Sequence, residues 1–302
     1  MKKIILIDGN AILHRAYHSL PPFSTSKGEV SNAIYGFIRM LFDVYTKVKP
    51  DYIGIAWDRK APTFRHEEFK EYKATRTAPP DDLYPQLPRL KEVIKAFNIP
   101  MLELDGFEAD DILGTLAHKS EKVEDLETII LTGDKDAFQL VTEKTHVMTP
   151  VKGISQVVMY DPEQVKEKLG VRPDQVIDYK ALCGDTSDNI PGVQGIGPKQ
   201  ASALLQKYDT LDNIYNHLDE LSTGQQKKLG EDKENAYMSQ KLASIILDVP
   251  IDFELDRYRT HDIDYNKVEN LFEELEFKTM INKLADLKKR LAPPDPSQQS
   301  LF

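Results

Sequence analysis

Nine acidic side chains lie at five places along the chain, and together they suggest metal chemistry. They are Asp8, Asp58, Glu108, Asp110, Asp111, Asp134, Asp136, Asp185 and Asp188. Taken singly, each group has a plain explanation, such as an acidic first turn of a helix or an Asx-type turn. Carboxylates gathered in one place repel each other unless cations neutralise them, and hard divalent ions prefer oxygen ligands. A site with two metal ions, suited to hydrolysis of a phosphate ester, accounts for all nine.

Basic residues that could grip a phosphate lie between positions 59 and 76. This stretch holds six basic and three acidic residues, a local excess of three positive charges. Lys73 and Arg76 lie three residues apart and could clamp a phosphate, and Tyr72 beside them could stack on a base. The alternative is a solvated helix face in which Tyr72 is partly a core residue.

A glycine-rich segment, Gly192-Val193-Gln194-Gly195-Ile196-Gly197-Pro198-Lys199, offers a second phosphate contact. It is not a nucleotide-binding P-loop, because proline occupies the position where that motif needs lysine. We expect a hairpin between two helices, with Gly195, Gly197 and Lys199 facing a DNA phosphate at a helix N-terminus. A plain glycine-rich turn is the alternative.

The acidic groups need elements that bring them together, and the apolar pattern supplies these. Runs of branched apolar residues at 3–7, 52–57 and 128–131 predict buried strands, with helical periodicity at 32–48, 87–97 and 110–121. This alternation predicts an α/β fold with a mostly parallel central sheet and flanking helices. Ligands bind at the carboxyl ends of such strands, so the acids that follow the strands are expected to meet there.

The chain is expected to contain two domains and a tail. Residues 1–170 form the α/β domain, 171–291 lack strand signals and form a helical domain, and the proline-rich residues 292–302 form a flexible tail.

The composition limits the partners and the cellular compartment that can be expected for the protein. The 302 residues carry a net charge of −10 with a pI near 5.3, which taken alone argues against nucleic-acid binding. Cys183 is the only cysteine, which excludes a disulfide within the chain. With no apolar run of membrane-spanning length and no export signal, we expect a cytoplasmic protein with no membrane partner.

These motifs resemble those of the bacterial 5′-nuclease (flap endonuclease) family, known best as the N-terminal domain of DNA polymerase I. The resemblance covers residues 4 to about 291. Its anchors are LIDGN at 6–10, AWD ending at 58 and followed by APTFRHE, YKATR at 72–76, GFEADD at 106–111, LTGDKD at 131–136, GDTSDNIPGVQGIGPK at 184–199 and LEFKTMI at 275–281.

The resemblance implies a PIN/resolvase-like nuclease core with a helical arch, followed by a helical domain with a helix-hairpin-helix-type DNA-binding element. It implies two Mg²⁺ ions, with Mn²⁺ as a substitute. One ion is held by Asp8, Asp58, Glu108, Asp110 and Asp111, and the other by Asp134, Asp136, Asp185 and Asp188. Lys73 and Arg76 fall on the arch, and the hairpin can hold K⁺. The catalytic residues implied are Lys73, Arg76, Asp8, Asp58, Asp111 and Asp134.

The function implied is 5′-3′ exonuclease and 5′-flap endonuclease activity on branched DNA with a free 5′ end, in RNA primer removal and repair near the bacterial nucleoid. We expect a monomer, either a free-standing nuclease or a piece of a polymerase. Two alternatives are a non-catalytic branched-DNA-binding replication factor and a related α/β metal-dependent ribonuclease. The tail resembles peptides that bind the bacterial sliding clamp, through Gln298, Leu301 and Phe302, although Gln299 replaces the usual leucine.

Overall fold

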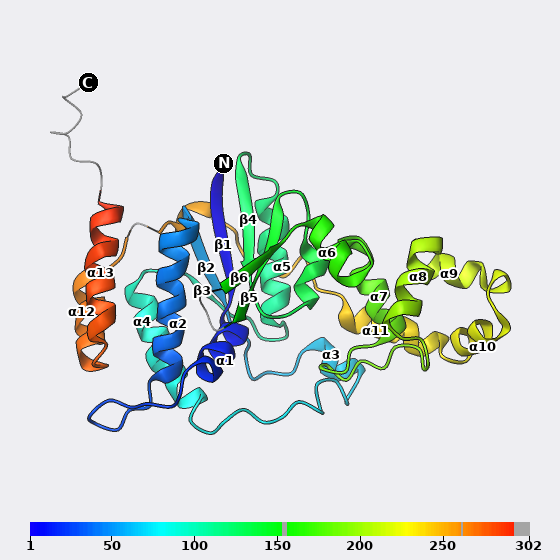
Figure 1. Ribbon diagram of the computed structural model, residues 1–302, viewed down its shortest axis with the longest axis horizontal. Coiled ribbons are helices and arrows are strands. Elements are labelled where there is room, and N and C mark those ends of the chain that lie inside the picture. The colour runs from blue at the N-terminus through cyan, green and yellow to red at the C-terminus, as the bar shows by residue number, and fades with distance from the viewer. Residues whose placement is uncertain (153–155, 261, 293–302) are drawn as a thin grey trace.

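A six-stranded sheet forms the centre of the protein, shown by a computed structural model that describes residues 1–152, 156–260 and 262–292 (Figure 1). The strand order is β3-β2-β1-β4-β5-β6. The first five of these strands are parallel, and β6 pairs with β5 in the antiparallel sense. The strands are β1 (Lys2–Asp8), β2 (Tyr52–Ala56), β3 (Met101–Leu102), β4 (Leu126–Leu131), β5 (Thr145–Lys152) and β6 (Gln156–Tyr160). The expectation of a mostly parallel α/β sheet is confirmed.

Helices flank the sheet and continue beyond it. The helices that lie between the first strands in the sequence are α1 (Gly9–Ser19), α2 (Asn32–Asp43), α3 (Phe64–Glu68), α4 (Leu87–Ala96) and α5 (Ala109–Ser120). The later ones are α6 (Pro162–Leu169), α7 (Val176–Cys183), α8 (Pro198–Tyr208), α9 (Leu211–Asn216), α10 (Thr223–Glu231), α11 (Lys233–Ala243), α12 (Tyr265–Glu274) and α13 (Lys278–Leu291). No helix in these ranges is both long enough and apolar enough to cross a membrane.

Alternation along β1 explains how the sheet is covered on both sides. Ile5 and Ile7 belong to one apolar core with α1, α2 and α4, and Ile4 and Leu6 belong to a second core with α5 and the following helices. Successive side chains of a strand point to opposite faces, so the uninterrupted apolar run IILI is the pattern of a strand buried on both sides. The register also aligns the strand ends, since Ile7 pairs with Leu131 and Asp8 with Ala56.

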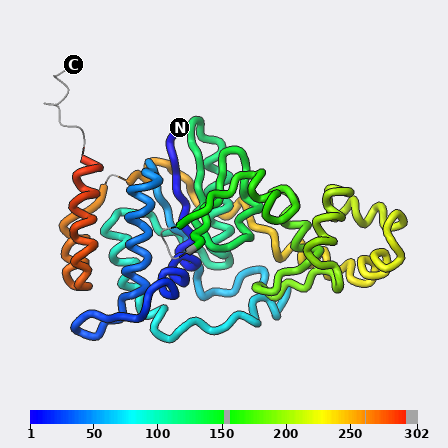
Figure 2. Tube along the Cα trace, in the orientation of Figure 1, coloured from blue at the N-terminus to red at the C-terminus, as the bar shows by residue number. Residues whose placement is uncertain are grey.

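The last two helices of the chain pack against the α/β domain. Val268, Phe272, Met280 and Leu284 of α12 and α13 are buried in the same core as α2 and α4. Figures 1 and 2 show this helix pair on the side of the sheet opposite to α8, α9 and α10. The helical domain expected at 171–291 includes these two helices, whereas in this structure their apolar side chains pack in the core of the α/β domain.

The segment expected to form a helical arch is mostly non-helical in this structure. Beyond α3, residues 70–75 form turns, and the chain then runs without a helix to residue 83. Figure 2 shows the segment crossing the open edge of the molecule between α3 and α4. Pro79 and Pro80 within this segment account for part of this, because proline disfavours helix interiors.

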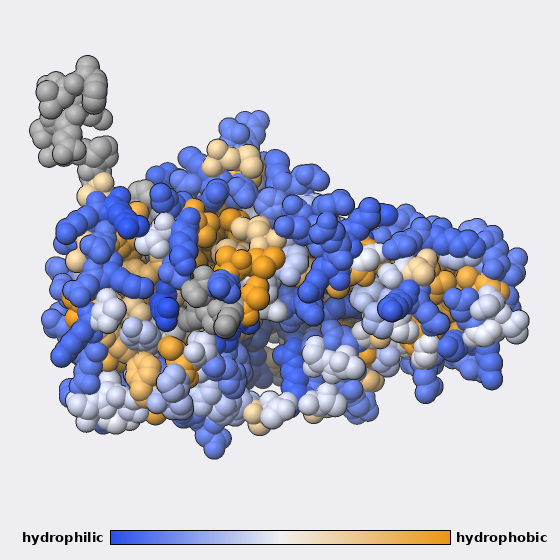
Figure 3. Space-filling model, viewed as in Figure 1, coloured by the Kyte–Doolittle hydropathy of each residue, from blue (hydrophilic) through white to orange (hydrophobic). Residues whose placement is uncertain are grey.

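Most of the visible surface is polar, with apolar side chains exposed in several places. Figure 3 shows apolar side chains gathered over β5 and β6, where Val151, Val157 and Val158 are exposed.

Candidate active site

A cleft of about 1190 Å³ opens at the carboxyl ends of the parallel strands, as the sheet topology predicts. Seven of the nine expected carboxylates line it: Asp8, Asp58, Glu108, Asp110, Asp134, Asp136 and Asp185. They come from the ends of β1 and β2, the start of α5, the turn after β4 and the loop after α7. The fold therefore brings together acids that lie up to 177 positions apart in the sequence.

Asp8 is fixed at the centre of this cleft by its neighbours. Its Oδ1 accepts a hydrogen bond from the amide of Ala11 at 2.9 Å, which caps the start of α1. Its Oδ2 accepts one from the Thr132 hydroxyl at 2.8 Å. The Thr132 hydroxyl oxygen in turn accepts the amide of Asp134 at 3.0 Å, so a single uncharged side chain orients two of the acids.

Asp58 is oriented by contacts to two other motifs. Its amide donates to the side-chain carbonyl of Asn10 at 3.0 Å, and its Oδ1 accepts from the amide of Ala109 at 2.7 Å. Gly9 is required beside it, because a Cβ at that position would lie 2.5 Å from the Trp57 ring. In the DGN sequence of residues 8–10, Asp8 thus supplies a carboxylate, Gly9 leaves room for the Trp57 ring, and Asn10 accepts a hydrogen bond from Asp58.

The acids repel each other in the absence of cations. Burial, with the nearby charges of Asp58 and Asp134, raises the pKa of Asp8 to about 7. Burial and the charges of Asp134 and Asp8 also raise the pKa of Asp110. Such crowding is relieved by a bound divalent cation, and the donors are the hard oxygens that such ions prefer, so these residues fit the implied metal. Among the described residues, no three acidic, histidine or cysteine side chains already converge as a ready-made metal site.

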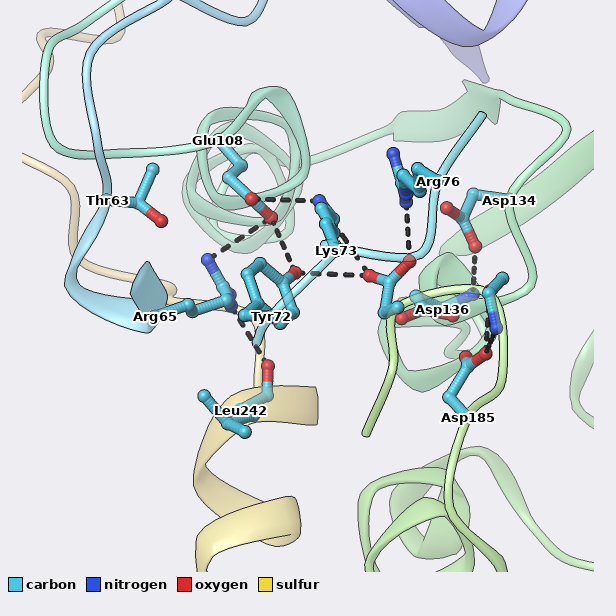
Figure 4. Close-up of polar contacts among 12 residues, drawn as sticks. Thr63, Arg65, Tyr72, Lys73, Arg76, Glu108, Asp134, Asp136, Asp185 and Leu242 are labelled. Atoms are coloured by element: carbon cyan, nitrogen blue, oxygen red, sulfur yellow. Dashed lines mark hydrogen bonds and ion pairs between the residues drawn. The ribbon is translucent and has the colours of Figure 1, made fainter. Parts of the chain in front are cut away.

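Basic side chains neutralise several of the carboxylates instead (Figure 4). The Lys73 ammonium contacts Glu108 Oε1 at 2.8 Å, and the Arg76 guanidinium contacts Asp188 Oδ1 at 2.5 Å. The buried Lys180 ammonium bridges Asp136 and Asp185, with 2.6 Å to Asp185 Oδ2. Lys73 and Arg76 both line the cleft, as expected for residues that clamp a phosphate.

Asp111 does not line the cleft, contrary to the expectation that it is a catalytic metal ligand. Its carboxylate is fully buried and forms two hydrogen bonds with the Arg65 guanidinium, at 2.9 and 2.8 Å. Glu108 and Asp111 are three residues apart, but the Glu108 side chain reaches the cleft and the Asp111 side chain folds back as part of the capping box of α5. Asp188 is also buried outside the lining, where it pairs with Arg76 and accepts from the Tyr72 hydroxyl.

Tyr72 is buried and is not placed to stack on a base in this structure, which corrects the expected DNA contact. Its ring packs with Ile190, Leu242 and Ala243. Its hydroxyl lies 3.1 Å from both Glu108 Oε2 and Asp188 Oδ2. The alternative of a core residue is therefore the better interpretation, and the hydroxyl also orients two acids.

The glycine-rich segment forms the expected hairpin between α7 and α8. Gly195, Gly197 and Lys199 are exposed on it, and Pro198, the first residue of α8, lines the cleft. The carbonyl oxygen of Gly195 accepts a hydrogen bond from the Lys228 ammonium at 2.9 Å. The hairpin thus lies beside the cleft, with Pro198 at their border.

Four residues of the site escaped the sequence interpretation: Asn10, Arg65, Thr132 and Lys180. Asn10 and Thr132 lie inside the recognised motifs but carry no charge, and Lys180 is a lone lysine in an apolar helix five residues before Asp185. Each acts through a residue distant in sequence, which spacing alone does not reveal. The expected clamp-binding residues Gln298, Leu301 and Phe302 lie outside the described residues.

Comparison with known proteins gives the same assignment. Residues 3–170 match the family described as 5′-3′ exonuclease, N-terminal resolvase-like domain, and residues 171–266 match the 5′-3′ exonuclease, C-terminal SAM fold. A 5′-3′ exonuclease of Aquifex aeolicus is 36% identical over 302 residues, covering all of both chains. DNA polymerase I of Bacillus subtilis is 42% identical over 286 residues, which are 94% of this chain and 32% of that protein.

Solved structures agree on the fold. The T5 D15 protein co-crystallised with metal ions superposes with a TM-score of 0.68 at 18% identity, covering 96% of this chain and all of that one. The chain spans about a third of the length of the polymerase relatives. From the matched family and the full-length relative, the chain belongs to the 5′-3′ exonuclease family.

Proposed function

We propose that the chain hydrolyses DNA phosphodiesters near a free 5′ end at a branch or flap, with the help of two divalent metal ions. The observation that carries this proposal is the cleft, in which seven carboxylates from five segments face Lys73 and Arg76. Family membership supports the reaction class, and the T5 D15 structure with metal ions supports the metal requirement. The cellular roles that follow are removal of RNA primers and displaced flaps, and DNA repair.

The donor set divides between two positions. Asp8, Asp58, Glu108 and Asp110 would hold one ion, and Asp134, Asp136 and Asp185 the other. Asp188, which lies outside the cleft lining in this structure, would join the second ion on release from Arg76. Divalent ions in such a pair activate a water and stabilise the leaving oxygen of a phosphodiester. Mg²⁺ is the ion we propose, with Mn²⁺ as a substitute, because all the donors are oxygens.

The protein's own residues perform the remaining tasks. Lys73 and Arg76 would bind and orient the phosphate next to the cut, since both side chains reach the cleft from the segment that crosses it. Asn10 and Thr132 hold Asp58 and Asp8 in fixed orientations. Asp111 is removed from the set of ligands, because Arg65 already satisfies its carboxylate.

The duplex next to the flap would contact the hairpin. The exposed Gly195, Gly197 and Lys199 lie at the N-terminus of α8, where amide groups and the helix dipole favour a phosphate. A K⁺ ion at the hairpin would have to share the Gly195 carbonyl with the Lys228 ammonium. We further propose that the protein acts as a monomer in the bacterial cytoplasm, with the tail residues Gln298, Leu301 and Phe302 as a ligand for the sliding clamp.

The deciding experiment compares the wild type with Asp134→Asn on a labelled 5′-flap DNA in Mg²⁺. We expect cleavage to fall at least about 100-fold, because the charge stabilisation supplied by a bound metal is worth several kcal/mol. Asp286→Asn is the matched control, since Asp286 is exposed on α13 and lies away from the cleft.

Parallel substrates separate the alternatives. Flap cleavage that Asp134→Asn leaves unchanged would remove the metal assignment. DNA binding without any cleavage by the wild type would indicate a binding protein, and a preference for RNA over flapped DNA would indicate a ribonuclease.

A further inference from the structure

Arg65 is a buried arginine to which the proposed function assigns no contact with metal or substrate. Its residue is 2% exposed, and its guanidinium lies between α5 and the end of α11. It forms two hydrogen bonds with Asp111, one from Nε to the carbonyl of Leu242 at 3.0 Å and one from Nη2 to the carbonyl of Ser244 at 2.7 Å. The planar guanidinium thus links α3, where the segment between α3 and α4 begins, to α5 and to the backbone at the end of α11.

The partner of Arg65 holds the start of α5. Asp111 accepts the amide of Glu108 at 3.0 Å and the amide of Ile246 at 2.9 Å. Its carboxylate is therefore fully satisfied by the protein, with no lone pair directed into the cleft. Glu108, whose backbone Asp111 fixes, is the residue that reaches the candidate metal position.

Glu108 is also contacted by three side chains from α3 and the turns that follow it (Figure 4). Arg65 Nη1 lies 3.5 Å from Glu108 Oε2, which accepts from the Tyr72 hydroxyl at 3.1 Å, and Lys73 contacts Oε1 at 2.8 Å. Movement of Arg65 would therefore change the position of Glu108, Tyr72 and Lys73 together.

The opposite end of this network reaches the hairpin. Ser239 of α11 is fully buried, and its hydroxyl oxygen accepts the amide of Gly192 at 3.0 Å. Gly192 has a φ of +64°, and a Cβ there would lie 2.3 Å from the Gly184 amide nitrogen, so this turn has little freedom to shift. Hairpin, α11, Arg65 and α5 form one connected path of hydrogen bonds and helix.

We propose that Arg65, with Asp111 as its counter-ion, is a positioning residue that fixes Glu108 and the Lys73–Arg76 turn relative to the hairpin. A duplex held at the hairpin then presents its phosphate to the cleft in one register. This inference rests on the proposed nuclease function, because it assigns the register of that function's substrate. Partners that orient metal ligands in this indirect way are worth about 10- to 100-fold in activity or metal affinity when removed.

The test uses three variants and single-turnover cleavage of a 5′-flap DNA in Mg²⁺. Arg65→Lys keeps the charge but loses the planar fork, and Arg65→Met/Asp111→Leu removes both charges at similar volume. Arg89→Lys is the matched control, because Arg89 also pairs with carboxylates, Glu92 and Glu274, but lies on α4. We expect the cleavage rate constant of the first two variants to fall about 10- to 100-fold with KM changed less than about 3-fold, and the control to match the wild type.

Amplitude and metal binding distinguish positioning from simple structural damage. With enzyme and DNA at equal, saturating concentrations, damage lowers the fraction of active molecules and hence the amplitude, while loss of positioning lowers the rate constant at full amplitude. Mn²⁺ binding by the double variant, followed by electron paramagnetic resonance, should keep the wild-type stoichiometry, because Asp111 is not a ligand.

Three results would overturn the inference: a wild-type rate constant in Arg65→Lys or the double variant, a loss confined to amplitude, or a lost Mn²⁺ ion. If the double variant does not fold, Arg65→Lys decides alone. Absence of flap cleavage by the wild type itself would instead refute the proposed function.

Discussion

Removal of the Lys180 charge gives the sharpest test of how the carboxylates of the cleft are neutralised. Its ammonium joins Asp136, which follows β4, to Asp185, which follows α7, and all three side chains are at most 15% exposed. Lys180→Met keeps the length of the side chain and removes the charge. In the metal-free protein, the two carboxylates then face each other without a counter-ion.

The magnitude follows from the state of Asp185. Burial opposes its ionisation, but the Lys180 ammonium and hydrogen bonds from Ser187 lower its pKa from 3.8 to about 2. A shift of this size stabilises the folded protein by about 2.5 kcal/mol at neutral pH, and this contribution disappears as the pH falls from about 4 towards 2. Breaking a fully buried ion pair costs about 3–5 kcal/mol. Since these groups keep some exposure and Ser187 remains, we expect a loss of about 2–3 kcal/mol.

Thermal unfolding at neutral pH, in EDTA and in saturating Mg²⁺, measures this loss. We expect the variant to melt about 4–8 °C below the wild type in EDTA. The difference should shrink in Mg²⁺, because a divalent ion can neutralise Asp136 and Asp185 in place of the ammonium. Lys227→Met is the control, since Lys227 belongs to an exposed pair with Glu231 and such pairs contribute about 0–1 kcal/mol. Equal melting of variant and wild type in EDTA, or a deficit that Mg²⁺ leaves unchanged, would refute the reasoning.

Two further predictions concern the body of the protein. Burial raises the pKa of Tyr258 to about 12, so the folded state keeps a proton that the unfolded state releases near pH 10, and stability should fall between pH 10 and 12 by up to about 2.7 kcal/mol from this group. Tyr258→Phe should reduce the fall in melting temperature over this range, and an unchanged alkaline profile would contradict the assignment. Phe272→Ala in α12 should cost about 3–5 kcal/mol, because Phe272 is fully buried in the core of α2 and α4. The fluorescence of Trp57, the only tryptophan, reports on that core in denaturant, and an unshifted midpoint would show that α12 does not support it.

The features that could be predicted from the sequence are those that depend on direction along a strand. The apolar run before Asp8 predicts a strand buried on both faces, and parallel strands end at one edge, so Asp8, Asp58 and Asp134 had to lie together. This conclusion needs no knowledge of the contacts between side chains.

The features that could not be predicted depend on a partner distant in the sequence. Glu108 and Asp111 have the same chemistry and nearly the same helical position, and only the guanidinium of Arg65, 46 residues earlier, draws one of them away from the cleft. The burial of Tyr72 is likewise decided by Leu242 and Ala243. For α12, the periodicity predicts an apolar face but not which core it covers.

The net charge of −10 takes on a different meaning once its distribution is known. Lys73 and Arg76, the basic side chains expected to clamp a phosphate, are each paired with a carboxylate proposed to bind metal, as is Lys180. A cation that neutralises Glu108 and Asp188 would weaken their ion pairs with Lys73 and Arg76. The two basic side chains would then be available to bind the substrate phosphate. The acidic balance is therefore no obstacle to DNA binding in itself. If the proposed function holds, DNA binding should depend on divalent metal, because one set of carboxylates competes with phosphate for the same basic groups.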